Sequence, residues 1–86
     1  MRRTRTGWVA QREDGATWTI GGVTADGIYI APGPAITYIH LAGTVDDEAG
    51  PRLEIPTDAA LLRELATAFK EIAEWREKGA WGGLHQ

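Results

Sequence analysis

The pattern of apolar and polar residues along the chain changes at Pro56. Before this proline, short runs of alternating apolar and polar residues are separated by turn residues, a pattern typical of β-strands. After it, apolar residues recur every three or four positions, as in an amphipathic helix. Several strands followed by one helix predict an α+β fold, in which an antiparallel sheet of four to five strands carries one C-terminal amphipathic helix packed on one face.

Five runs before Pro56 predict the strands. They are residues 7–11, 17–20, 28–30, 36–41 and 52–55. The first two are expected to pair with each other as a hairpin. The fourth is apolar on both of its faces, which predicts a central strand.

Glycine-containing pairs separate these runs. Asp14-Gly15 and Asp26-Gly27 predict turns, because aspartate and glycine suit turn positions with unusual φ angles. Gly21-Gly22 predicts a loose connection between two strands.

Residues 57–78 predict the helix. Thr57 is the expected N-cap, and Gly79 is expected to end the helix in a left-handed conformation. The apolar positions share one side of the helix and would cover the sheet. They are Leu61, Leu62, Leu65, Ala68, Phe69, Ile72 and Trp75.

The 86 residues predict a single domain at 7–79, preceded by a basic arm at 1–6 and followed by a tail at 80–86. Residues 1–12 contain four arginines and no acidic residue, whereas the rest of the chain contains five basic and twelve acidic residues. Such asymmetry is typical of a chain whose charged end makes an interaction.

The composition excludes several classes of catalytic and metal-binding site. The chain has no cysteine and no serine, which excludes disulfides, thiolate metal sites and the usual serine or cysteine nucleophiles. Its two histidines lack the spacing of metal ligands, and no glycine-rich phosphate loop is present. We therefore expect no enzyme activity, no cofactor and no metal. With no secretory signal and no membrane span, the protein is expected in the cytoplasm.

The outer face of the predicted sheet is the first candidate for binding a partner. If the aliphatic residues of the strands pack under the helix, an aromatic-rich set projects the other way. This set is Tyr29, Ile36, Tyr38 and His40, with Trp81 and Leu84 of the tail as secondary anchors. The alternative is that the N-terminal hairpin folds over this face and places Trp8 or Trp18 on the tyrosines.

Three other features have both a functional and a simpler interpretation. Arg2, Arg3 and Arg5 could contact the phosphates of a nucleic acid, or form an unstructured charged terminus. The acidic loop at 46–48 and the helix glutamates could imitate phosphates, or simply be solvated. His40, Glu54 and Arg52 could cleave RNA as base, acid and phosphate ligand, but a lone strand histidine is more often structural.

These observations predict a small non-enzymatic protein that binds a macromolecular partner as an inhibitor, adaptor or accessory factor, and that forms a homodimer. Its size and lack of catalytic residues suggest a phage or mobile-element gene whose product acts on a host system. A nucleic-acid-binding accessory protein that uses the basic arm is the alternative.

Overall fold

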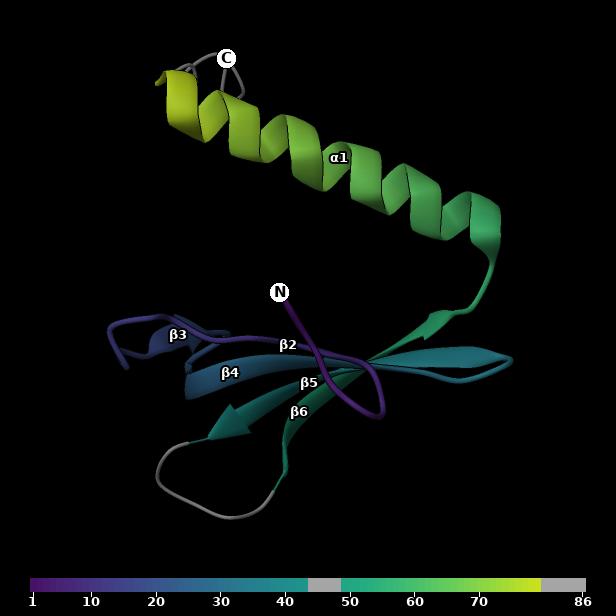
Figure 1. The fold of residues 1–86 in the computed structure, drawn as a ribbon, viewed down its shortest axis with the longest axis horizontal. Coiled ribbons are helices and arrows are strands. Elements are labelled where there is room, and N and C mark those ends of the chain that lie inside the picture. The colour runs from purple at the N-terminus through teal and green to yellow at the C-terminus, as the bar shows by residue number, and fades with distance from the viewer. Residues whose placement is uncertain (44–48, 80–86) are drawn as a thin grey trace.

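The computed structural model describes residues 1–43 and 49–79 (Figure 1). Within these residues, six strands precede one helix. The elements are β1 (Arg2–Arg3), β2 (Trp8–Ala10), β3 (Trp18–Ile20), β4 (Val23–Pro32), β5 (Ile36–Gly43), β6 (Ala49–Pro56) and α1 (Ala59–Lys78).

All strand pairs are antiparallel, and the sheet has the order β1-β2-β4-β5-β6. The ten-residue strand β4 pairs with β5 along one edge, while β2 and β3 lie in line along its other edge. Because β5 lies between β4 and β6, the predicted central strand is confirmed. The predicted α+β class is also confirmed, with α1 over one face of the sheet (Figure 1).

The predicted hairpin between the first two strands is wrong. Residues 8–10 pair with 28–30 and residues 18–20 pair with 23–25, so β2 and β3 share β4 as their partner. Gly21 and Gly22 have φ angles of 57° and 80°, the positive values that a tight two-residue hairpin turn needs. These glycines join β3 directly to β4, so β3 pairs with the first part of β4. The later part of the same edge of β4 then pairs with β2.

The turn predicted at Asp26-Gly27 is also wrong, because these residues lie inside β4. The pairing with β5 shifts between Ala25 and Gly27, which marks a β-bulge. A bulge inserts one residue into a strand and increases its local twist without ending it. The predicted strand at 28–30 is therefore only the second half of a longer strand.

The N-cap of the helix lies one residue later than predicted. The N–H of Leu61 donates to Oδ2 of Asp58 at 2.9 Å, so Asp58 is the N-cap. Thr57, just after β6, is hydrogen-bonded to the sheet region instead: its N–H donates to the carbonyl oxygen of Ala35, and its hydroxyl lies 2.7 Å from that of Thr37. The predicted end is confirmed, since Gly79 has a φ of 71°.

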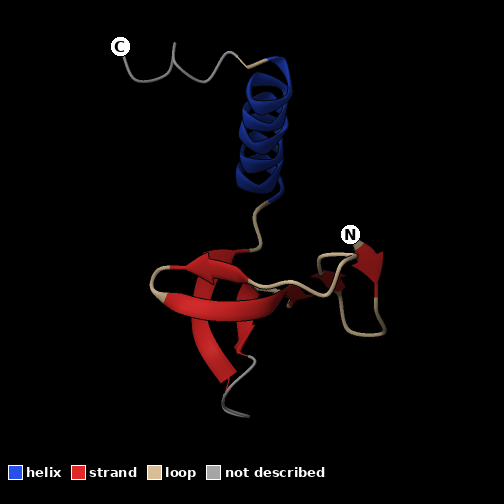
Figure 2. Ribbon diagram, turned by 90° about the vertical axis from the view of Figure 1, so that its left-hand side faces the viewer, coloured by secondary structure: helices blue, strands red, loops and turns tan. Residues whose placement is uncertain are grey.

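The helix carries the predicted apolar side chains but buries none of its residues. Phe69 is 63% exposed and Ile72 is 38% exposed. Figure 2 shows α1 above the sheet and joined to it by the short loop that follows β6. Among the described residues, the buried hydrophobic side chains are those of Val9 and Ala25, both in the sheet. No helix in this part of the chain is long and apolar enough to cross a membrane.

The first prediction concerns Gly7, which is buried at the start of β2. A Cβ atom at this position would overlap the carbonyl oxygen of Ile30. We expect Gly7→Ala to push β2 away from β4 and to lower the free energy of unfolding by about 1–3 kcal/mol in urea denaturation. The neighbouring change Thr6→Ala, at an exposed residue, is the control and should have little effect. Equal stability of the two variants would contradict this packing.

The second prediction concerns the helix cap. Asp58→Ala removes the acceptor of the Leu61 N–H and should lower the free energy of unfolding by about 0.5–2 kcal/mol. Asp58→Asn keeps an acceptor oxygen and should retain most of the stability. Urea unfolding followed by far-UV circular dichroism compares the two. If alanine and asparagine are equivalent, Asp58 is not the cap.

Candidate partner-binding face of the sheet

The strand register brings the predicted aromatic residues onto one face. Tyr29 of β4 lies directly opposite His40 of β5, and Tyr38 lies opposite Ala31. Ile36 precedes Tyr38 by two residues and therefore shares its face. The tyrosines and His40 are half-buried, so each keeps part of its side chain accessible to a partner.

Strand β6 adds two charged residues to the same face. Arg52 lies opposite His40, and Glu54 lies opposite Tyr38. Residues directly opposite each other in an antiparallel pair point to the same side of the sheet. We call this surface the aromatic face; its residues are Tyr29, Ile36, Tyr38, His40, Arg52 and Glu54.

The aromatic face is ordered by contacts among its own side chains. The guanidinium carbon of Arg52 lies 4.7 Å from the centre of the Tyr38 ring, a cation–π contact. The ring centres of Tyr38 and His40 are 6.1 Å apart, with the rings tilted by 40°. Tyr38 therefore contacts both a cation and a second ring before any partner binds.

Arg52 and Glu54 are members of this face that the sequence analysis assigned only to a possible catalytic group. The signal was present in the sequence. In residues 52–55, the charged residues Arg52 and Glu54 alternate with Leu53 and Ile55, so they point away from the aliphatic side of the strand. The sequence did not show which neighbours they would meet, because that depends on the register between β5 and β6.

The alternative in which the N-terminal hairpin covers this face is wrong. Strand β2 extends the sheet sideways at the edge of β4 and does not fold over it. Trp8 lies opposite Ile30, and Ile30 follows Tyr29 along β4 and so points to the other side of the sheet. Trp18 lies opposite Ala25, before the bulge. The N-terminal strands therefore lie beside the tyrosines and not over them, with Val9 directly opposite Tyr29.

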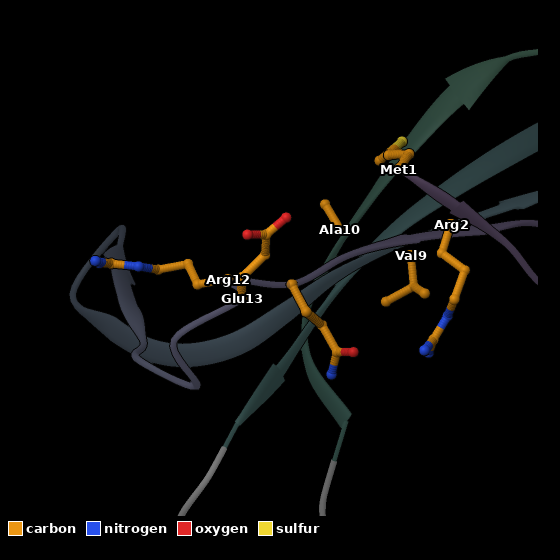
Figure 3. Close-up of a pocket in the computed structure, with 7 residues that line it drawn as sticks. Met1, Arg2, Val9, Ala10, Arg12 and Glu13 are labelled. Carbon is orange, nitrogen blue, oxygen red and sulfur yellow. The ribbon is translucent and has the colours of Figure 1, made fainter.

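Part of the basic arm forms a strand. The interpretation of the arm as an unstructured charged terminus is therefore wrong for Arg2 and Arg3. Arg2 and Arg3 make up β1 and pair with Val9 and Trp8, and the guanidinium carbon of Arg3 lies 4.4 Å from the centre of the Trp8 ring. Arg2 also lines a cavity of about 320 Å³ (Figure 3) together with Arg12. The two side chains point in different directions (Figure 3), so they do not converge on one phosphate.

The register places His40, Arg52 and Glu54, the possible catalytic group, on one face. It does not place the acid and the base directly opposite each other. His40 faces Arg52 directly, while Glu54 faces Tyr38 and is only a diagonal neighbour of His40. The Arg52 guanidinium stacks on Tyr38. A catalytic arginine would instead have to point at the phosphate that it stabilises.

The other candidates fall outside this face or outside the described residues. Trp81, Leu84 and the acidic loop at 46–48 are not described by the structure. Within residues 1–43 and 49–79, no three side chains of the metal-ligating types come together. The pKa of Asp14 is lowered because the N–H of Ala16 donates to its carboxylate. The Arg12 guanidinium also lowers it, with Nη2 of Arg12 lying 3.2 Å from Oδ2 of Asp14. Asp14 belongs to the exposed connection between β2 and β3.

The chain was compared with known proteins at the level of families, sequences and folds. No family model, no curated protein and no solved structure matches it.

Proposed function

We propose that the protein is a small non-enzymatic interaction module that binds a protein partner through the aromatic face. The observation that carries this proposal is the group formed by Tyr38, His40 and Arg52, whose side chains are ordered against one another and still accessible. Tyrosine and arginine are among the residue types that dominate binding energy at protein interfaces. Their contacts here reduce the conformational entropy that would be lost on binding.

The position of the face in the sheet supports this function. Its residues come from β4, β5 and β6, and β4 and β5 are paired along both edges. A site on paired strands keeps its geometry better than a site on loops. The face combines aromatic rings with Arg52 and Glu54, and the register places Val9 and Arg2 on the same side of the sheet next to Tyr29. This mixture suits the chemistry of a protein surface.

The charge of the chain favours a protein partner over a nucleic acid. The net charge is −3, and the face includes Glu54 as well as Arg52. A nucleic acid would be repelled by the acidic body, whereas a protein can match both signs. In this proposal the module acts in the cytoplasm as an inhibitor, adaptor or accessory factor and associates with itself; the absence of cysteine fits a reducing compartment.

The third prediction tests the aromatic face. Tyr38→Lys removes the central ring and places a second cation beside Arg52, so the affinity for the partner should fall by at least about tenfold. The partner is first captured from extracts of the natural host cells by cross-linking, and its affinity is then measured by calorimetry. Thr19→Lys is the matched control, because it adds the same charge at an exposed position of β3.

Two results would contradict this proposal. If Tyr38→Lys binds the captured partner as well as Thr19→Lys does, the aromatic face is not the binding site. If the captured partner is a nucleic acid whose binding is abolished by salt and by the pair Arg2→Gln and Arg5→Gln, the protein works through its arm instead.

A further inference from the structure

Strand β6 is an open edge of the sheet. It pairs with β5 on one side, and no strand in the described part of the chain pairs with its other side. The opposite end of the sheet is β1, which has only two residues, whereas β6 has eight. Arg52, Leu53 and Glu54 of β6 are all exposed. A strand edge of this length has backbone groups that can pair with a further strand.

The register shows which backbone groups of β6 face outward. The N–H of Thr57 donates to the carbonyl oxygen of Ala35, so these two residues form a hydrogen-bonded pair. Hydrogen-bonded pairs alternate with non-hydrogen-bonded pairs along two antiparallel strands. The backbone of Leu53 therefore bonds to β5, and the N–H and C=O groups of Arg52 and Glu54 point away from β5.

We propose that a second copy of the chain pairs with this edge, with the two β6 strands antiparallel and a two-fold axis at Leu53. Arg52 of each copy then lies opposite Glu54 of the other copy, and Leu53 lies opposite its own counterpart. The outward groups of Arg52 and Glu54 would form four backbone hydrogen bonds across the axis. The proposal rests on the proposed function in one respect, because it identifies the surface through which the module associates with itself.

The charges at the edge favour a second copy as its occupant. Arg52 and Glu54 have opposite signs, point to the same side of the sheet and form no ion pair with another described residue. In the antiparallel pair, each of them meets the opposite charge of the other copy. The Arg52 guanidinium stacks on Tyr38, and such stacking leaves the N–H groups in the guanidinium plane available to a carboxylate. The segment Arg52-Leu53-Glu54 is therefore complementary to itself when its direction is reversed.

The same charges select one register. Only residues with outward backbone groups can form hydrogen-bonded pairs, so the nearest alternatives centre the axis on Arg52 or on Glu54. An axis at Arg52 places two arginines directly opposite each other, and an axis at Glu54 does the same with two glutamates. Like charges directly opposite are destabilising. The axis at Glu54 would also place Pro56 opposite Arg52, and proline has no N–H to donate.

Leu53 adds an apolar contact at the axis. Its side chain is 57% exposed in a single chain. It lines a hollow of about 340 Å³ with Ile20, Ile39, Leu41 and Arg52. At a non-hydrogen-bonded position the opposite Cα atoms are about 4.5 Å apart, so the two Leu53 side chains would touch. The edge contact would therefore bury apolar surface as well as form hydrogen bonds.

The dimer would place the two aromatic faces side by side. Residues directly opposite each other point to the same side of a sheet, so both faces lie on one side of a continuous sheet. The rings of Tyr29, Tyr38 and His40 belong to β4 and β5, one or two strands away from the new contact. Pairing through β6 would therefore leave these rings available to the protein partner.

The fourth prediction tests the pairing by sedimentation velocity over roughly a hundredfold range of concentration. The natural chain should form a dimer as the concentration rises. Arg52→Glu places two glutamates opposite each other and Glu54→Arg places two arginines opposite each other, so each change should raise the dissociation constant at least about tenfold. Arg63→Glu makes the same change of charge as Arg52→Glu at an exposed position of α1 and should remain dimeric. Because all three residues are exposed, circular dichroism should show that the fold is retained.

A mixture of the two single variants tests both the occupant and the register. A chain with Arg52→Glu has two glutamates at the edge, and a chain with Glu54→Arg has two arginines. Each variant repels itself, but one chain of each kind brings opposite charges together at both positions, so an equimolar mixture should form a heterodimer. In this heterodimer and in the natural dimer, hydrogen exchange followed by nuclear magnetic resonance should show protected amides at residues 52 and 54. A loss of stability in either variant would not be reversed by mixing.

Each other result overturns the proposal. A natural chain that stays monomeric over the whole range excludes the dimer, and amides at 52 and 54 that become protected only when the partner is added would assign the edge to the partner. Single variants that are as dimeric as Arg63→Glu place the interface elsewhere, and a mixture that stays monomeric excludes this register. Failure of the partner site is separate: if Tyr38→Lys still binds the partner while the mixture forms a heterodimer, the pairing through β6 stands and the aromatic face does not.

Discussion

The whole structure depends on backbone pairing along both edges of β4. One edge of this strand pairs with β5 over nearly its full length, and the other edge accepts β3 and then β2. Every other strand joins the sheet through one of these neighbours. The bulge at Asp26 lies between the two segments of β4 that pair with β3 and β2. A bulge adds twist at this point, so one continuous strand serves partners that come from separate parts of the chain.

This architecture is held together by strand pairing more than by a buried core. Among the described residues, only Val9 and Ala25 are buried hydrophobic residues, and α1 buries nothing. A chain of this size has little interior to spare, because its surface is large relative to its volume. Its apolar surface therefore remains accessible in a single chain, and that surface is where binding partners gain the most free energy.

Two accessible surfaces lie on different elements and differ in chemistry. The aromatic face combines rings, an arginine and a glutamate on paired strands, which is the mixed surface that suits a heterologous protein. The apolar side of α1 consists of aliphatic and aromatic side chains, of which Phe69 is 63% exposed.

The sequence alone determined the elements and the sides of the strands. The apolar pattern predicted five runs that each overlap an observed strand, although 28–30 is only part of β4, and it predicted the helix. Gly79 predicted the helix end, and alternation put Tyr29, Ile36, Tyr38 and His40 on one side. Only the tertiary structure decided which strands pair. It placed β2 and β3 on one edge of β4, set Arg52 and Glu54 beside the rings, and hydrogen-bonded Thr57 to the sheet region so that Asp58 caps the helix. The physical reason is that alternation is a property of a single strand, whereas register is settled by turn geometry and by backbone hydrogen bonds between distant residues.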